Sequence, residues 1–470
     1  MSFVFYDTET TGTDTWFDQI LQFAAIKTDA DLNELDRFEI RCRLLPHVVP
    51  SPGAMRVTGV RASQLTDLSY CSHYEMMRAI RAKLLEWSPA TFIGYNSLDF
   101  DEPLLRQAFY QTLHSPYLTN TSGNTRSDAM RMVHACNVFA PNCLIIPIGD
   151  KGRPVFKLDR LAPANGFNHD HAHDALADVE ATIFMCRLIL ERAPDVWSSF
   201  MRFTRKPAVV DYITAEPVFC LSEIYFGRTL SYLVTAIGQN PENGNDWYLY
   251  DLAIPPETLA AMTEAQLQQR LAISPKPIRT LRSNGVPIIF PGDEAPANCK
   301  GAEFGLGELE RRAEMLRDDD AFRRRLMVAY AAGKEPYPES PHVEQQIYSG
   351  FFDSEQHLMD AFHDAPWEKR AGIVDRFQDA RLKAIGYRLI HAERPDLMAG
   401  DLRLRHDVEL AQRIATENAD HPWLTVPRAL ADLDDLLGSS TGVEATLLVG
   451  HRQFLRNLQQ QMMLRAQCAT

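Results

Sequence analysis

The sequence predicts an α/β domain that is followed by a small β-rich domain and an all-helical domain. Three successive patterns along the 470 residues support this prediction. Strand-like and helix-like segments alternate over the first ~190 residues, which is typical of an α/β domain with a mixed sheet. Short β-rich segments then follow up to about residue 305, and helical periodicity dominates beyond it. We therefore expect three domains, at 1–195, 196–340 and 341–470.

The first domain contains strand and helix patterns in alternation. Apolar residues with period two or in short runs predict strands at 3–7, 19–29, 37–45 and 90–96. Helical periodicity predicts helices at 72–87, 100–113 and 174–192, and Pro194 marks the end of the last one. In that last helix the spacing of apolar residues predicts a buried stripe at Leu176, Val179, Ile183 and Leu190.

The β-rich domain and the helical domain follow in the same order. Strands are expected at 218–226, 229–238 and 246–253, and NPENGN between the last two favours a turn. RSNGVPIIF at 282–290 indicates a further hairpin, so this domain is expected to be a small barrel or sandwich. Helical patterns begin at 306–333, and PYPESPH at 336–342 is typical of a linker.

Composition excludes several classes of protein. The chain is 45% hydrophobic and 23% charged, as expected for a globular protein, and no apolar run approaches the roughly 18 residues of a membrane helix. MSFVFYDTETTG lacks the basic and apolar regions of a signal peptide, which predicts a cytoplasmic protein. The eight cysteines form no C-x-x-C pair, so neither a disulfide framework nor a thiolate zinc site is expected.

The net charge of −14 disfavours a protein whose whole surface binds nucleic acid, because phosphate affinity needs clustered Lys and Arg. A locally basic groove remains compatible with this charge. One candidate is the interval from Arg126 to Arg160, which contains Arg131, Lys151, Arg153 and Lys157. The alternative is an ordinary solvated face.

Four carboxylates stand where predicted elements begin or end. Asp7 and Glu9 are two apart on an extended segment, so both point to one side of the sheet. Asp101 opens a predicted helix, and Asp178 lies in the first turns of the last helix. An isolated D-x-E is common at solvated strand ends, but four such acids and a histidine are the set of groups that holds two Mg²⁺ ions about 3.5–4 Å apart for phosphodiester hydrolysis.

Three histidines, at 169, 171 and 173, precede Asp178 in NHDHAHDALAD. A shared zinc ion requires all three on one face, but the predicted helix start breaks their alternation. A solvated triplet without a function is a second alternative. The third is a single working residue, His173, which lies five residues before Asp178 and has a pKa range suited to taking a proton from water. His169 and His171 are expected to have no comparable partner and to belong to the loop.

Together these residues resemble a known family. DTETTGT (7–13), FDEPLLR (100–106) and HDALAD (173–178) are similar to the motifs of the DEDDh exonucleases, which have an RNase H-like fold. Within them, the chain resembles the bacterial exodeoxyribonuclease I family, which has a nuclease domain, an SH3-like domain and a helical domain. The segments that carry this closer resemblance are 22–29, 52–59, 94–102, 156–166, 172–182 and 346–354.

The resemblance implies roles for individual residues. It makes Asp7, Glu9, Asp101 and Asp178 the ligands of two Mg²⁺ ions, for which Mn²⁺ can substitute, and it makes His173 the general base. The residues that fall where the family contacts the nucleic acid strand are Glu9, Thr10, Arg106, Tyr117 and Lys157. Enterobacterial members carry Arg at the position of Lys157, so the resemblance implies that the charge is kept here but does not imply bidentate phosphate contact.

The implied activity is 3′ to 5′ digestion of single-stranded DNA to 5′-mononucleotides, in DNA repair and recombination. The implied protein is a monomer without membrane contact, and its implied partner is the acidic tail of single-stranded DNA-binding protein. The basic patch for that tail is not placed by the sequence, although 381–394 is one candidate. Two alternatives stay open: a 3′ to 5′ exoribonuclease or oligonucleotidase of the same superfamily, and a non-catalytic scaffold that binds single-stranded nucleic acid.

Overall fold

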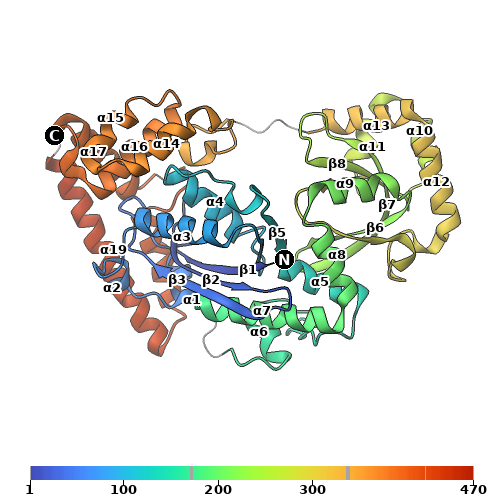
Figure 1. The fold of residues 1–470 in the computed structure, drawn as a ribbon, viewed down its shortest axis with the longest axis horizontal. Helices are drawn as coiled ribbons and strands as arrows, with labels where there is room; N and C mark the ends of the chain where they lie inside the picture. The colour runs from blue at the N-terminus through green and yellow to red at the C-terminus, as the bar shows by residue number, and fades with distance from the viewer. Residues whose placement is uncertain (1, 170–172, 335–338, 419, 469–470) are drawn as a thin grey trace.

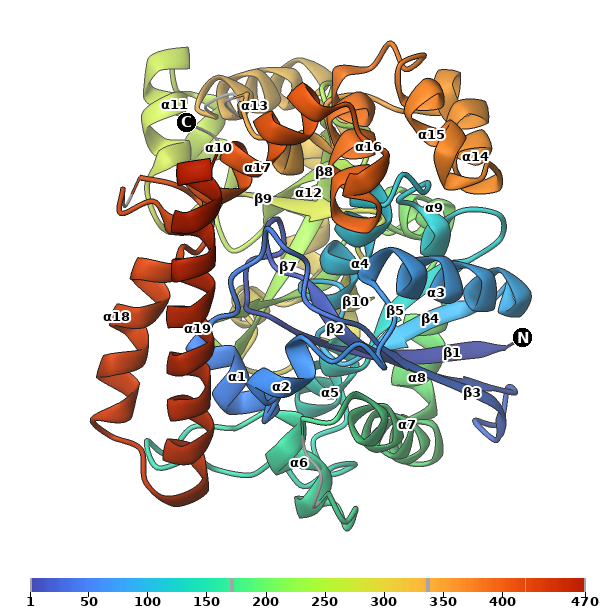
Figure 2. The ribbon, with the colours of Figure 1, turned by 90° about the vertical axis from the view of Figure 1, so that its left-hand side faces the viewer.

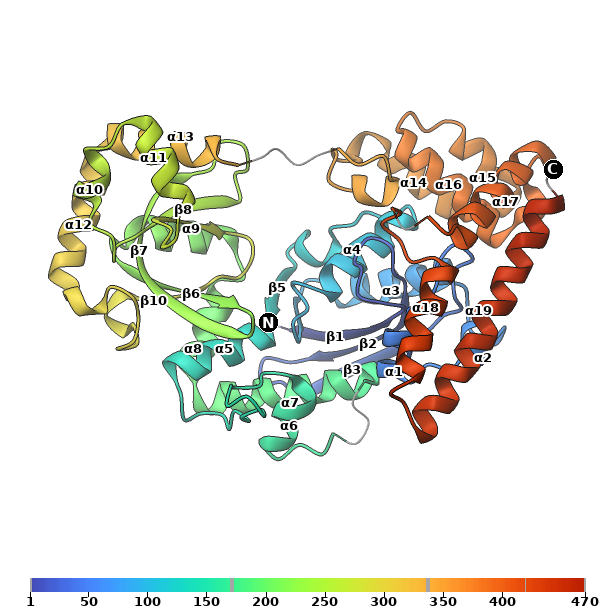
Figure 3. The same cartoon turned by 180° about the vertical axis from the view of Figure 1, so that it is seen from behind.

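The computed structural model describes residues 2–169, 173–334, 339–418 and 420–468. Figure 1 shows a first sheet with its helices, a second sheet beside it, and a set of C-terminal helices above the first sheet. Figure 3 gives the same arrangement from behind. Of the helices described, none combines the length and the apolar character that crossing a membrane requires.

The first sheet has five strands in the order β3-β2-β1-β4-β5. Strands β1 (Phe3–Thr10), β2 (Ile20–Thr28) and β3 (Glu34–Arg41) are antiparallel neighbours. Strands β4 (Thr91–Gly94) and β5 (Thr125–Asp128) run parallel to β1. The sheet is therefore mixed, as predicted, and β1 continues through the D-x-E motif.

Alternation along β1 divides the core of this sheet. Phe3 and Phe5 pack on one face with α5 (Ala129–Phe139) and α7 (Ala175–Arg192). Val4 and Tyr6 pack on the other face with α3 (His73–Trp87) and α4 (Asp101–Gln111). The smaller helices of this part are α1 (Pro52–Thr58), α2 (Ala62–Leu65), α6 (Leu158–Ala164) and the 3-10 turn η1 (Leu118–Asn120).

Two details of the first domain differ from the sequence prediction. The third strand begins at Glu34 and ends at Arg41, because Cys42 leaves the strand and pairs with Cys71 instead. In α7, Val179 and Ile183 are buried as expected. Leu176 and Leu190 are only partly buried, although both pack against the same core.

The second sheet is antiparallel and has the order β10-β6-β7-β8-β9. Its strands are β6 (Phe219–Tyr225), β7 (Arg228–Gln239), β8 (Asp246–Asp251), β9 (Ile278–Arg282) and β10 (Ile288–Pro291). The prediction of a hairpin at 282–290 is wrong. Strand β9 pairs with β8 and β10 pairs with β6, so the two strands lie at opposite edges of the sheet. Over the described residues this part has one sheet, which excludes the sandwich alternative.

Helices cover both faces of the second sheet. Helix α8 (Pro194–Arg202) connects it to the first domain, and α9 (Lys206–Ala215) packs on one face through Val209 and Ile213. The other face packs against α10 (Pro256–Ala260), α11 (Glu264–Ala272), α12 (Leu306–Asp318) and α13 (Asp320–Ala332). The predicted helical segment 306–333 is thus two helices, separated at Asp319.

The C-terminal part is helical, as predicted. Its helices are α14 (Gln356–Asp364), α15 (Trp367–Val374), α16 (Ala380–Glu393), α17 (Gly400–Ala415), α18 (Val426–Leu437) and α19 (Gly442–Cys468). Figure 2 shows α18 and α19 side by side next to α1 and α2 of the first domain. In the predicted linker at 336–342, positions 336–338 lie outside the described residues.

Candidate active site

Three carboxylates meet at the end of β1. Asp7 and Glu9 project from the same side of the strand, opposite Ala24 and Gln22 of β2. Helix α7 packs on the face of the sheet that carries Phe3 and Phe5, and it brings Asp178 to Asp7 and Glu9. One oxygen from each of the three carboxylates lies within 4.8 Å of the other two. This is the only such group of potential metal ligands found among the described residues.

Asp101 stands next to this group as the first residue of α4. Its side chain is buried, and its Oδ1 accepts a hydrogen bond of 2.5 Å from the Thr8 hydroxyl. Thr8 lies between Asp7 and Glu9 on β1, so this bond fixes the fourth carboxylate to the strand that carries the first two.

Burial opposes ionisation of all four acids, and neighbouring carboxylates add repulsion. Burial, reinforced by Asp101, Asp178 and Glu9, raises the pKa of Asp7 well above its usual range. Burial followed by Asp178 raises the pKa of Glu9 to about 9. Burial also raises the pKa of Asp101 to about 7 and that of Asp178 to about 6. A divalent cation would remove this repulsion, and an all-oxygen donor set suits a hard ion such as Mg²⁺.

The histidines near Asp178 occupy different positions. His173 is exposed, has a positive φ of 68°, and lies just before α7. Its charge and its backbone N–H both lower the pKa of Asp178. His169 is the surprise: its side chain is 1% exposed and its Nε2 lies 2.8 Å from Asp178 Oδ1. The expectation that His169 has no partner is therefore wrong, while His171 lies outside the described residues.

Sequence reasoning missed the contacts that fix the start of α7. Asp174 caps this helix by accepting a hydrogen bond from the Leu176 backbone N–H. Its other carboxylate oxygen accepts hydrogen bonds from Gln22 of β2 and from Arg41 of β3. Asp174 thus anchors the turn that precedes Asp178 to two strands, and Arg41 also lowers the pKa of Glu9.

The residues expected to contact the nucleic acid lie in three places: at the end of β1, at α4, and at the start of α6. Thr10 ends β1, and its hydroxyl donates to the Gly12 carbonyl at 2.7 Å. Arg106 of α4 lies over the Tyr117 ring, with its guanidinium carbon 5.2 Å from the ring centroid. Lys157 is exposed at the N-cap of α6. The sequence indicated Arg126 only as part of a basic interval, yet the structure brings it to the same carboxylate, Glu102, as Arg106.

Comparisons with known proteins agree with this geometry. A family profile described as "Exonuclease" matches residues 4–185, which span the first sheet and α7 up to Met185. Exodeoxyribonuclease I of Escherichia coli K12 is 28% identical over 401 residues, which cover 82% of this chain and 84% of the relative. Exodeoxyribonuclease I of Buchnera aphidicola from Baizongia pistaciae is 30% identical over 414 residues, or 85% of each chain.

Solved structures share the fold over nearly the whole length. Exonuclease I of Methylocaldum szegediense superposes with a TM-score of 0.85 at 24% identity, over 97% of this chain and 99% of its own. Escherichia coli exonuclease I in complex with a dA16 oligonucleotide gives a TM-score of 0.84 at 23% identity and the same coverage. With these folds and the 30% identical relative, the chain belongs to the exodeoxyribonuclease I family.

Proposed function

We propose that this protein is a Mg²⁺-dependent 3′ to 5′ exonuclease that degrades single-stranded DNA to 5′-mononucleotides, in DNA repair and recombination. The observation that carries the proposal is the group formed by Asp7, Glu9 and Asp178 with Asp101 beside it. These are the positions that match the metal-binding motifs of the family. Relatives named exodeoxyribonuclease I and the exonuclease I complexes with dA16 and dT13 support the choice of substrate.

Different side chains would bind the metal ions, accept a proton and position the helix. Asp7, Glu9, Asp101 and Asp178 would hold two Mg²⁺ ions, for which Mn²⁺ can substitute. When bound, such ions lower the pKa of water and stabilise the attacking and leaving oxygens. His173 would act as the general base, because its exposed position before α7 would let the imidazole reach a water molecule at the carboxylates. Asp174 would hold the start of α7, and with it Asp178, against β2 and β3.

Binding of the strand would involve residues around the carboxylates. Glu9 and Thr10 at the end of β1 would meet the terminal nucleotide. Arg106 and Tyr117 would meet the strand on the α4 side, where a guanidinium and an aromatic ring suit a phosphate and a base. Lys157 would supply a positive charge from the exposed start of α6.

We propose three domains, at 1–195, 196–340 and 341–470, that act together on one strand. Two observations support the division: each of the first two parts has its own sheet, and the C-terminal part is helical. The first and the C-terminal parts also contact each other near α4, where Tyr110 donates a hydrogen bond to the Val343 carbonyl at 2.9 Å. Such contacts would shape a passage that admits single strands and rejects duplex.

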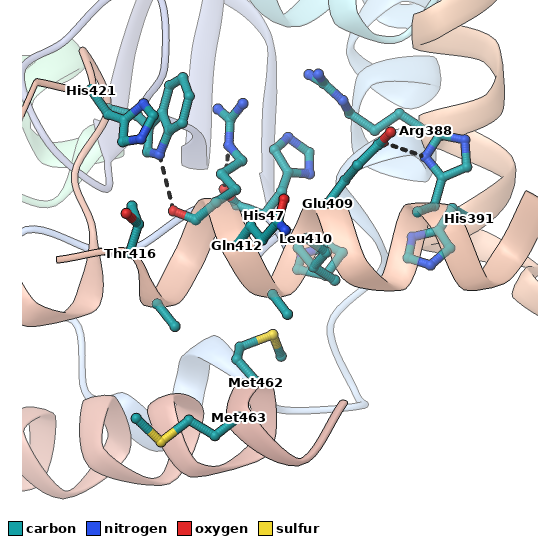
Figure 4. A pocket seen from close by; sticks show the side chains of 16 residues that line it. His47, Arg388, His391, Glu409, Leu410, Gln412, Thr416, His421, Met462 and Met463 are labelled. Carbon is teal, nitrogen blue, oxygen red and sulfur yellow. Dashed lines mark hydrogen bonds and ion pairs between the residues drawn. The ribbon is translucent and has the colours of Figure 1, made fainter. Parts of the chain in front are cut away.

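A cavity of about 720 Å³ lies between the loop at His47 and helices α16, α17 and α19 (Figure 4). Arg388 and His391, from the candidate basic segment 381–394, line it together with Arg413. We propose this cavity as the site for the acidic tail of single-stranded DNA-binding protein, the partner that the family resemblance implies. The protein is further proposed to act in the cytoplasm as a monomer.

One comparison of substrates tests the function. Single-stranded DNA labelled at the 3′ end or at the 5′ end, duplex DNA and RNA are each incubated with the protein and Mg²⁺. We expect immediate release of a labelled mononucleotide from the 3′-labelled single strand, with slow or no digestion of duplex and RNA. Preferred digestion of RNA would support the exoribonuclease alternative instead. Binding without any digestion would support the scaffold alternative, although all five proposed catalytic residues are present.

A further inference from the structure

Glu102 follows the proposed metal ligand Asp101 but belongs to a different cluster. Its side chain is 2% exposed, and Glu102 is not among the three carboxylates that meet within 4.8 Å. Oε1 accepts hydrogen bonds from Arg106 Nη2 at 3.0 Å, from Arg126 Nη1 at 2.9 Å and from the Thr119 hydroxyl at 2.6 Å. Oε2 accepts one from the Tyr6 hydroxyl at 3.2 Å. This buried carboxylate is therefore fully satisfied.

One carboxylate here faces two guanidinium groups, which leaves an excess of one positive charge. Both arginines are mostly buried, with side chains 14% and 11% exposed for Arg106 and Arg126. Arg106 Nε is buried and has no hydrogen-bond partner among the described residues. A buried N–H donor without an acceptor is costly, so an anionic group that binds here would gain from satisfying it.

The two arginines also reach the other parts of the molecule. Arg106 Nη1 donates to the Tyr348 hydroxyl at 3.1 Å, in the segment that precedes α14. Arg126 Nη2 lies 3.5 Å from the Asn284 carbonyl oxygen, in the turn between β9 and β10. Glu102 is thus the common anchor of two side chains, one of which extends to the C-terminal part and the other to the second sheet.

We propose that Glu102 is a positioning residue, which holds Arg106 and Arg126 at a fixed place beside Asp101 so that their remaining N–H groups bind phosphates of the DNA strand. This inference rests on the proposed function, because it assigns the anionic ligand as the strand whose end lies at the carboxylates. The hydrogen bonds of Glu102 with Arg106 and Arg126 are observed whether or not the proposed function holds. Without Glu102, two long side chains would lose their common acceptor, and ordering them on a phosphate would cost conformational entropy.

The alternative is that Glu102 only stabilises the fold. Removing one partner of a buried ion pair typically costs about 3–5 kcal/mol, so stability alone does not separate the two roles. The salt dependence of DNA binding does separate them. Each phosphate contact to single-stranded DNA contributes a slope of about −0.7 to the plot of log K against log salt. A positioning role therefore predicts a smaller slope, and a purely structural role does not.

The chain offers a matched control in Glu344. This carboxylate is also 2% exposed and also carries two arginines, since its Oε1 accepts hydrogen bonds from Arg388 at 2.7 Å and from Arg413 at 2.8 Å. Both of these arginines line the cavity of Figure 4 and are not proposed to contact the strand. Glu344→Gln should therefore resemble Glu102→Gln in its effect on stability and differ in its effect on DNA binding.

The experiment measures binding of the full chain to a 5′-fluorescein-labelled dT oligonucleotide by anisotropy, in EDTA to prevent digestion, over a range of NaCl concentrations. We expect Glu102→Gln to reduce the slope by up to about 1.4, the contribution of two phosphates, with affinity at low salt lowered by about tenfold. Glu344→Gln should keep the wild-type slope. Arg106→Met with Arg126→Met should reproduce the Glu102→Gln slope, and adding Glu102→Gln to that pair should reduce it no further.

The possible results distinguish failure of the proposed function from failure of the role proposed for Glu102. Wild-type protein that does not bind the oligonucleotide contradicts the proposed function itself. Wild-type binding with an unchanged slope in Glu102→Gln contradicts only the role of Glu102. Equal loss of slope in Glu102→Gln and Glu344→Gln would also overturn the inference, because the effect would then follow stability. Thermal unfolding of each variant identifies the folded fraction, so that a variant that fails to fold is replaced by Glu102→Asp.

Discussion

At the scale of single residues, the site is defined by carboxylates that repel one another. Burial and neighbouring acids raise the pKa of Glu9 to about 9 and that of Asp178 to about 6. In the unfolded chain both groups ionise near pH 4. Without metal, the folded protein therefore holds extra protons between about pH 4 and pH 9. The contribution of these two groups to the free energy of unfolding must therefore fall as the pH rises through that window.

This repulsion gives a prediction for Asp7→Asn, which removes one charge from the group. Between pH 7 and 9 in EDTA, the midpoint of thermal unfolding should fall more for the wild type than for Asp7→Asn. Mg²⁺ should stabilise the wild type more at pH 9 than at pH 6, because the ion binds the ionised carboxylates. Asp99→Asn, at a largely exposed acid, is the control and should follow the wild type. Equal stabilisation by Mg²⁺ at both pH values would contradict this account.

The histidines also make a prediction at this scale. His173→Ala should lower kcat by about 100-fold or more, the usual contribution of a general base. His169→Ala should lower it much less, although its imidazole contacts Asp178. The measurement is steady-state digestion of single-stranded DNA at saturating Mg²⁺. Equal losses in the two variants would contradict the assignment of His173 and favour a metal ion shared by several histidines.

At the scale of elements, regular patterns were predictable and long-range pairings were not. Strand β1 and helix α7 have clear periodicity, and both occur where the sequence placed them. The turn after β9 also forms, with the Gly285 N–H donating to the Arg282 carbonyl at 3.0 Å. Its flanking strands nevertheless go to opposite edges of the sheet. Turn chemistry is local, whereas the pairing of β10 with β6 depends on packing between residues far apart in sequence.

Helix α7 provides the prediction at the scale of elements. Asp174→Ala removes the N-cap and the acceptor for Gln22 and Arg41, so it should cost about 1–2 kcal/mol of stability. It should also weaken Mg²⁺ binding, because Asp178 lies one turn further along the same helix. Asp174→Asn retains an oxygen acceptor, so it should lose less stability and less Mg²⁺ affinity than Asp174→Ala. Isothermal titration with Mg²⁺ and thermal unfolding test this. Unchanged metal affinity in Asp174→Ala would contradict the anchoring role.

At the scale of the whole molecule, the sequence predicted the order of the three parts but not where they meet. The motifs of the proposed metal site were recognisable because each lies at the edge of a regular element. The contacts of Glu102 were not, because its partner Arg126 lies 24 residues away and Arg106 reaches Tyr348 across 242 residues. Such contacts depend on the packing of separate parts, for which a single sequence contains no periodic signal.

The most direct test of the central claim is digestion of 3′-labelled single-stranded DNA by the Asp7→Ala variant in the presence of Mg²⁺. Asp7 is one of the three carboxylates that meet within 4.8 Å, so Asp7→Ala would remove a proposed metal ligand. We expect kcat to fall by at least about 1000-fold with the fold retained, which is equivalent to about 4 kcal/mol of transition-state stabilisation. Wild-type digestion by a folded Asp7→Ala protein would contradict it.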